Sequence, residues 1–328
     1  MSRIAYIERS FSAEHELIIA QVNALGVRYQ AQGLDLTLRQ AYYRLVAAGA
    51  IPNTEQSYKR VGGIINQARL AGRLDWDHIV DRTRNMRANS HWDTPADIID
   101  SAARSYAEDK WDRQGTRVEV WVEKDALVGV LQAVCPDNDV AYFSCRGYTS
   151  QSEIWGAAQR LGEYIERGQN VVVIHLGDHD PSGIDMSRDI EDRLRMFIAQ
   201  DQFGAPPASS TDDYKDAYLL DTEDVLTIER IALNMDQVLR YDPPPNPTKI
   251  TDSRAGGYIN RFGQSSWELD ALEPQTLIDL IQDAVDSHKD PELWDEAVAA
   301  EEGQRAVLTA AARRWNDVAT MLNGRGSQ

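Results

Sequence analysis

Residues 117–199 alternate between short apolar segments rich in β-branched residues and longer segments in which apolar residues recur at helical spacing. The expected strands are 117–123 (RVEVWVE), 140–145 (VAYFSC) and 170–176 (NVVVIHL). Helical patterns follow them at 124–134, 150–167 and 187–199. Strands that alternate with helices form a parallel sheet with helices on both faces. The pattern therefore predicts a Rossmann-like α/β domain over 116–328, and the part after residue 215 is expected to be mostly helical to about Leu322.

Three helical segments precede this domain. Apolar residues recur with helical period over 11–32, 36–48 and 54–71. We place Thr37 as the N-cap of the second helix and expect a short extended element at 78–81. Three helices followed by an extended element are the outline of a winged helix, in which one helix usually enters the major groove of DNA. We therefore expect a winged-helix domain at 1–87, joined to the α/β domain by a linker at 88–115 that forms a helix.

The net charge of −18 argues against a nucleic-acid partner, but the charge is unevenly distributed. Residues 1–120 hold 16 of the 34 basic residues and 15 of the 52 acidic residues. Within 39–87 there are 9 basic and 4 acidic residues, and salt confines the field of each charge to about 8–10 Å. A basic face for double-stranded DNA is one interpretation, and a solvated surface of uneven charge is the other. The residues expected to contact DNA are Lys59, Arg60, Arg69, Arg73 and Arg84.

The cysteine content and the hydropathy pattern indicate the compartment. Cys135 and Cys145 are too few for a disulfide framework or a four-thiolate zinc site. No apolar run approaches the length of about 18 residues that a membrane span requires. The N-terminal segment MSRIAYIERSFSAEHE lacks the apolar region of a secretory signal. We therefore expect a cytoplasmic protein that is associated with nucleic acid and has no membrane partner.

Acidic residues follow two of the expected strands. Asp178 and Asp180 come directly after 170–176, and Glu123 ends 117–123. Functional groups collect at the carboxyl ends of strands in an open parallel sheet. Carboxylates that meet there repel one another unless a hard cation such as Mg²⁺ binds them. The sequence therefore predicts a Mg²⁺ site formed by Glu123, Asp178 and Asp180.

The same acids have simpler interpretations. Asp178 and Asp180 can form an acidic turn that caps the next helix, and Glu123 can be a surface charge at a strand–helix turn. The spacing from Asp178 to Asp189 also nearly fits an EF-hand calcium loop. An EF-hand needs a helix before the loop, whereas the preceding residues VVVIHL indicate a strand.

At these motifs the chain resembles the Toprim domain of topoisomerases, primases and nucleases. Residues 120–127 (VWVEKDAL) are similar to its Glu motif, and residues 175–183 (HLGDHDPSG) to its Asp-x-Asp motif. The Pro-Ser-Gly end of the second motif resembles the A subunit of type IIB topoisomerases (topoisomerase VI) and the related meiotic double-strand-break protein. That family places a winged helix before Toprim, with a nucleophilic tyrosine in a motif that residues 38–43 (LRQAYY) match. The resemblance covers roughly residues 35–200, and 267–272 (WELDAL) match a later family segment weakly.

The resemblance implies a Mg²⁺-dependent DNA-cleaving isomerase of the topoisomerase VI A-subunit type. Tyr43 would attack a backbone phosphate and remain linked to the 5′ end. A phenol with a pKa of about 10 is mostly protonated at neutral pH, so Arg39, one helical turn earlier, would hold the phosphate or favour the phenolate. The family pattern also implies a homodimer in which Tyr43 of one protomer works beside the metal site of the other. Because the chain has no Walker A motif, strand passage would require a separate ATPase subunit.

Three other functions stay open. The first is a Toprim nuclease that hydrolyses DNA with metal-activated water, and the second is a DNA-binding or assembly protein whose Toprim site is inactive. The third is a phosphotransfer or phosphatase domain with Asp178 as its nucleophile, against which the winged-helix-like N-terminus argues. Recombination, replication, defence and viral DNA metabolism are all compatible with these functions.

Overall fold

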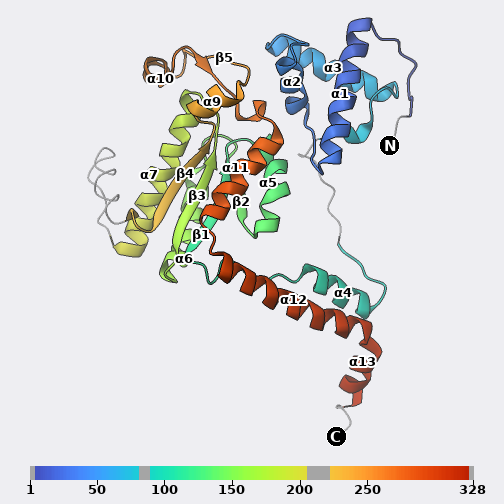
Figure 1. Cartoon of the computed structure of the whole chain (residues 1–328), viewed down its shortest axis with the longest axis vertical. Helices are drawn as coiled ribbons and strands as arrows, with labels where there is room; N and C mark the ends of the chain where they lie inside the picture. The colour runs from blue at the N-terminus through green and yellow to red at the C-terminus, as the bar shows by residue number, and fades with distance from the viewer. Residues whose placement is uncertain (1–3, 81–88, 205–221, 325–328) are drawn as a thin grey trace. The chain divides into compact units, whose positions relative to one another are not determined.

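The computed structural model describes residues 4–80, 89–204 and 222–324 (Figure 1). The chain divides into two compact units. The larger unit combines 1–83 with 117–288, and the smaller unit combines 84–116 with 289–328. Every residue of the candidate site belongs to the larger unit.

The larger unit is built around a four-stranded sheet in the order β2-β1-β3-β4. Its strands are β1 (Thr116–Val122), β2 (Ala141–Ser144), β3 (Asn170–Leu176) and β4 (Leu226–Ala232). β2 runs parallel to β1, and β4 runs parallel to β3. The amide of Glu123 donates to the carbonyl of Leu176 at 2.8 Å, so the two central strands end at the same edge. The predicted α/β class with a parallel sheet is confirmed, and the arrangement is consistent with a Rossmann-like domain.

The described part after residue 222 is mostly helical as expected, but the sequence predicted no strand at the position of β4. Its sequence is LTIERIA, in which Glu229 and Arg230 interrupt the apolar pattern. The strand forms because β3 offers a parallel partner along its length, from Val171 opposite Leu226 to His175 opposite Arg230. Pairing and burial decide strand formation more strongly than local propensity does.

Helices cover both faces of the sheet (Figure 1). α6 (Gln151–Glu166) and α7 (Pro181–Phe203) pack on one face, and α5 (Val128–Val134) and α11 (Pro274–Ser287) lie on the other. The core between the sheet and the first pair includes Trp121, Ile154, Leu161, Val173 and Leu194. α7 begins at Pro181 and not at the expected residue 187. It begins early because Asp180 caps it and proline is well suited to a first helical turn.

Three helices form the N-terminal part of the larger unit. They are α1 (Ala13–Ala31), α2 (Leu38–Ala47) and α3 (Glu55–Leu70), close to their predicted ranges. Thr37 caps α2 as predicted and forms a capping box with Gln40. The apolar core of these helices includes Tyr42 and Tyr43, and it extends to Ala271 of the α/β part.

The winged-helix assignment stays a prediction. Where an extended element is expected at 78–81, residues Trp76–His78 form a 3-10 turn, which Asp75 caps by accepting from the amide of Asp77. Within the described residues 4–80, the β pairing is a single antiparallel bridge between Ala5 and Ala71. The first part of any wing after Val80 would lie outside the described residues.

A segment after β4 returns the chain to the carboxyl edge of the sheet. It contains α9 (Met235–Tyr241), α10 (Ala255–Phe262) and the antiparallel pair β5 (Asn246–Pro247) and β6 (Ser265–Ser266). His179 and Trp267 then exchange two backbone hydrogen bonds of 2.9 Å. This pairing places Glu268 and the 3-10 turn Leu269–Ala271 beside the loop after β3. Two further 3-10 turns are Asp125–Leu127 and Pro136–Asn138.

The smaller unit pairs α4 (Pro95–Ser105) with α12 (Pro291–Arg313), which α13 (Trp315–Gly324) follows. Trp111 is fully buried, and its ring lies 5.9 Å from that of Trp294. Lys110 forms an ion pair of 2.7 Å with the buried Glu301. The segment 88–115, expected to form a linker helix, contains the helix α4, which packs against α12. Among the described helices, none has both the length and the apolar character that a membrane crossing requires.

Candidate active site

Asp178 lies at the carboxyl end of β3 and is 5% exposed. Its backbone amide donates to Glu123 Oε2 at 2.8 Å, and its Oδ1 accepts from the amide of Leu269 at 2.7 Å. Glu123, which directly follows β1, is also buried. Two of the three predicted metal ligands are thus brought together at one edge of the sheet.

Asp180, the third predicted ligand, holds the start of α7. Its Oδ1 accepts from the amide of Gly183 at 2.6 Å and from the hydroxyl of Ser182 at 2.9 Å. This is the helix-capping turn that the sequence also allowed. The Asp180 carboxylate is partly exposed, and it lines a cavity that is described below.

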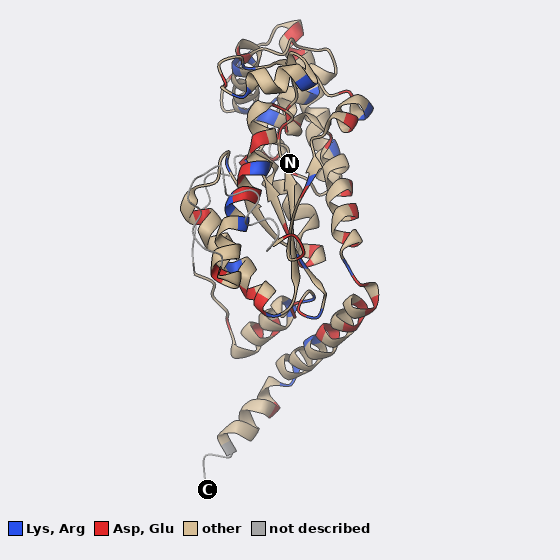
Figure 2. Ribbon diagram, turned by 90° about the vertical axis from the view of Figure 1, so that its left-hand side faces the viewer, with Lys and Arg blue, Asp and Glu red and all other residues tan. Residues whose placement is uncertain are grey.

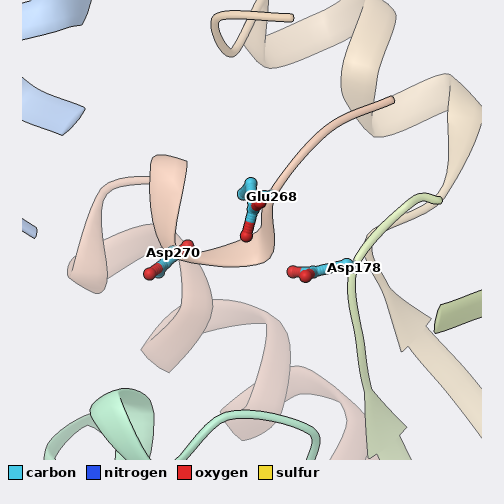
Figure 3. A group of neighbouring side chains, drawn as sticks. All are labelled: Asp178, Glu268 and Asp270. Carbon is cyan, nitrogen blue, oxygen red and sulfur yellow. The ribbon is translucent and has the colours of Figure 1, made fainter. Parts of the chain in front are cut away.

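Two acids that the sequence did not assign to the site complete a cluster with Asp178. One carboxylate oxygen from each of Asp178, Glu268 and Asp270 lies within 4.8 Å of the others. Figure 3 shows the Asp178 side chain pointing toward the loop that holds the other two acids. Asp270 is 1% exposed. Within the described part of the chain, this is the acidic group whose oxygens lie close enough together to share an ion.

The sequence contained only a weak signal for Glu268 and Asp270. They lie in the WELDAL segment, and nothing in the sequence indicated that this segment is close to Asp178. The backbone pairing of His179 with Trp267 brings them there. The Tyr258 hydroxyl reinforces this pairing because its single proton lies between the carbonyl oxygens of His179 and Ser265, at oxygen–oxygen distances of 2.9 and 3.1 Å.

Two cations neutralise much of the acidic cluster. Lys124 Nζ lies 2.8 Å from Asp178 Oδ1 and 3.0 Å from Asp270 Oδ1, and it forms a further ion pair with Glu268. Arg39 Nη2 lies 2.6 Å from Glu268 Oε2, and Arg39 Nε lies 2.7 Å from Asp270 Oδ2. The predicted phosphate-binding residue Arg39 is therefore held by two acids of the cluster.

Burial and these cations act on the carboxyl groups in opposite directions. Burial raises the pKa of Asp178 well above its usual range, although Lys124 opposes the shift. Burial also raises the pKa of Glu123, and the charge of Asp180 adds to that effect. For Glu268, burial is outweighed by Lys124 and Arg39, which lower its pKa to about 2. Glu268 is thus firmly ionised, whereas ionisation of Asp178 and of the neighbouring Glu123 is costly without another cation.

Tyr43 and part of this cluster line one cavity of about 540 Å³. Tyr43 and Arg39 contribute from α2, Asp180 and Glu268 from the sheet edge, and Lys249 from the segment after β5. The Arg39 guanidinium lies 5.7 Å from the centre of the Tyr43 ring. Burial nevertheless raises the pKa of Tyr43 to about 12, and the charges of Glu268 and Asp270 add to the shift. Tyr43 also packs against Tyr42, so it is both a core residue and a cavity residue.

The residues predicted to contact DNA are mostly engaged within the protein. Ion pairs of 2.6–2.7 Å join Lys59 to Glu55, Arg60 to Glu14 and Arg73 to Glu16. Arg69 stacks on Trp76 and donates to its carbonyl oxygen at 2.8 Å. Arg84 lies outside the described residues. In the view of Figure 2, Lys and Arg are interspersed with Asp and Glu. Exposed ion pairs contribute only about 0–1 kcal/mol, so a DNA phosphate could exchange for these acids.

The acidic cluster fits a hard divalent cation. Its three carboxylate oxygens are the donor type that Mg²⁺, Mn²⁺ and Ca²⁺ prefer. In octahedral coordination at about 2.1 Å, neighbouring oxygens around Mg²⁺ lie about 3.0 Å apart and opposite ones about 4.2 Å. The three oxygens, which lie within 4.8 Å of one another, would draw together to hold one ion.

A scan against protein-family models, a search of curated proteins and a search of solved structures each returned no match. Any assignment of function therefore rests on the motifs of this chain and on the geometry of its site.

Proposed function

We propose that the chain is a metal-dependent DNA-cleaving enzyme of the type IIB topoisomerase A-subunit kind, with Tyr43 as its nucleophile and Mg²⁺ as its ion. The cavity supports this proposal most directly. It brings Tyr43 and Arg39 together with Asp180 and Glu268, and Glu268 belongs to the acidic cluster. A phosphodiester in this cavity would meet a nucleophile, a guanidinium and the acidic cluster at once.

In the proposed step, the phenolic oxygen of Tyr43 forms a bond to phosphorus, and the bond from phosphorus to the 3′ oxygen breaks. The phenol gives its proton to water in the cavity, and the leaving oxygen takes up a proton. The products are a 3′ hydroxyl and a 5′ phosphotyrosine. Arg39 holds the phosphate beside the ring. Asp178, Glu268 and Asp270 would hold the ion, which when bound supplies positive charge for the phosphate and the leaving oxygen.

The test is plasmid cleavage with Mg²⁺, stopped with detergent and analysed with and without protease. We expect breaks that appear after denaturation and remain linked to protein. Tyr43→Phe and Asp178→Asn should each lose at least 100-fold in cleavage. Tyr42→Phe is the matched control, because the Tyr42 hydroxyl donates to Asn53 Oδ1 at 2.9 Å and its loss should leave cleavage intact. Linked ends that persist in Tyr43→Phe would refute the proposal.

A hydrolytic nuclease is the second candidate, and the environment of Tyr43 favours it. A phenol whose pKa is raised to about 12 is a poor nucleophile unless bound phosphate and metal bring it down. In a hydrolytic enzyme the acidic cluster would hold the ion that activates a water molecule, and Tyr43 would be a packing residue. Free 5′ ends and full cleavage by Tyr43→Phe would support this candidate.

The resemblance also leads us to propose a homodimer and a separate ATPase subunit. In the homodimer that the resemblance implies, Tyr43 of one protomer would act at the metal site of the other. The cavity described above instead places Tyr43 beside Asp180 and Glu268 of its own chain, so the step proposed here uses the residues of one chain.

A further inference from the structure

Lys124 lies at the centre of the acidic cluster. It stands between β1 and the turn Asp125–Leu127, and its side chain is 14% exposed. Its Nζ contacts Asp178 Oδ1, Asp270 Oδ1 and Glu268 Oε2. One ammonium thus touches one oxygen of each acid that could share a metal ion.

Arg39 holds a different position. It pairs with Glu268 and with Asp270. At Asp270 it contacts Oδ2, whereas Lys124 contacts Oδ1. It comes from α2, on the side of the cavity that contains Tyr43. Among the ion pairs of the described residues, Lys124 is therefore the cation that joins all three acids, and Arg39 flanks two of them.

A divalent ion bound by these three oxygens would lie where Lys124 Nζ lies. Metal–oxygen distances are about 2.0–2.6 Å, and the Nζ–oxygen distances are 2.8 and 3.0 Å for the two aspartates. Both cations therefore need the same small volume, and within it they would repel each other strongly. The two states of the cluster, with lysine or with metal, exclude each other.

We infer that Lys124 holds the metal position closed in the metal-free protein and that a divalent cation binds by displacing its ammonium. This inference rests on the proposed function, of which it names the regulation. The lysine charge sits on a flexible four-carbon chain, so the displaced ammonium can turn toward the cavity. The charge of Lys124 already acts on Tyr43 there. The displaced ammonium would then pair with the DNA phosphate, so that binding of the metal would increase the affinity for DNA and binding of DNA would increase the affinity for the metal.

The alternative is that Lys124 is a fixed structural cation that keeps the acids together. The two roles predict opposite effects of its removal on metal affinity. A displaced competitor weakens metal binding, so its removal strengthens binding. A structural cation organises the ligands, so its removal weakens binding.

The experiment measures Mn²⁺ binding to the full chain by electron paramagnetic resonance at pH 7. We expect Lys124→Met to bind Mn²⁺ at least tenfold more tightly than the unaltered protein. Lys249→Met is the matched control, since Lys249 lines the cavity that Glu268 also lines and has no ion pair with the three acids among the described contacts. The Mn²⁺ affinity of this variant should change less than threefold. Arg39→Gln removes one positive charge beside the cluster, and its Mn²⁺ affinity should increase less than that of Lys124→Met. Equal or weaker binding by Lys124→Met would overturn the inference, as would an equal gain in Arg39→Gln.

A second variant and a second readout distinguish a change in metal affinity from a folding defect. Lys124→Gln keeps a polar side chain of similar reach and must also bind Mn²⁺ more tightly. In thermal unfolding, Mn²⁺ should raise the midpoint of both Lys124 variants more than that of the unaltered protein. A smaller rise would contradict the inference. These readouts need no DNA, so failure of the plasmid assay with tighter Mn²⁺ binding would refute the proposed function alone.

Discussion

Glu268 is one of the two acids that pair with both cations of the site. Its Oε2 pairs with Arg39 and with Lys124. Burial acts against its ionisation, but the two cations lower its pKa to about 2 from the ordinary 4.5. Because the folded pKa lies below the unfolded one, the ionised group stabilises the fold fully above pH 4.5, and this contribution disappears as the pH falls toward 2.

We therefore expect Glu268→Gln to lower the free energy of unfolding by about 2–3 kcal/mol at pH 7 in EDTA. Urea unfolding measures this difference, which should be clearly smaller at pH 3.5. Glu273→Gln is the matched control, because Glu273 pairs with Arg44 but is 46% exposed. It should cost less than about 1 kcal/mol. A Glu268→Gln effect that does not change with pH would contradict this account of the ion pairs.

For single residues, the sequence predicted the site acids that directly follow apolar strands. It missed the site acids that come much later in the chain. Glu123 and Asp178 could be placed together because parallel strands end at one edge. Glu268 and Asp270 flank Leu269, whose amide donates to Asp178. Leu269 and Asp178 are 91 residues apart in the sequence. Their position depends on the pairing of Trp267 with His179, which no local pattern indicates.

The start of α7 packs so closely on the loop after β3 that its third residue must be glycine. A Cβ on Gly183 would lie 2.2 Å from the backbone oxygen of Asp178. The amide of Gly183 also donates to Asp180. The glycine of the Pro-Ser-Gly motif therefore allows the start of α7 and the loop after β3 to lie in contact.

Gly183→Ala should lower the free energy of unfolding by about 3 kcal/mol or more, since backbone must move to relieve the overlap. It should also weaken Mn²⁺ binding. Gly156→Ala, in α6, is the control: its Cβ would meet nothing within 4 Å, and it should be neutral or stabilising by up to about 1 kcal/mol. Chemical denaturation compares the two. Similar stability in both variants would show that the loop does not need this close approach.

Elements with strong local patterns were predictable, and elements that depend on neighbours were not. β1, β2, β3 and the three N-terminal helices lie close to their expected ranges. β4 was missed because Arg230 breaks its pattern, yet that arginine donates to the backbone oxygens of Gly177 and Asp178. The residue that interrupts the apolar pattern of β4 thus helps to hold the loop after β3.

At the scale of the whole molecule, the candidate site lies entirely within the larger unit. The helices that contribute Arg39 and Tyr43 share an apolar core with Ala271, next to Asp270. Under the proposed function, DNA would have to exchange for internal carboxylates, because the net charge is −18 and the N-terminal cations are paired with acids. Binding should therefore depend on local displacement of ion pairs and not on a uniform basic field.

The measurement that tests the central claim most directly is mass spectrometry of the protein after cleavage of DNA and nuclease trimming. Trypsin releases the peptide Gln40–Arg44, which contains Tyr42 and Tyr43. We predict a nucleotide attached through phosphate to Tyr43 in the unaltered protein, with no adduct in Asp178→Asn. An adduct on Tyr42, or cut DNA with free 5′ phosphates and an unmodified peptide, would contradict the assignment of Tyr43 as the nucleophile.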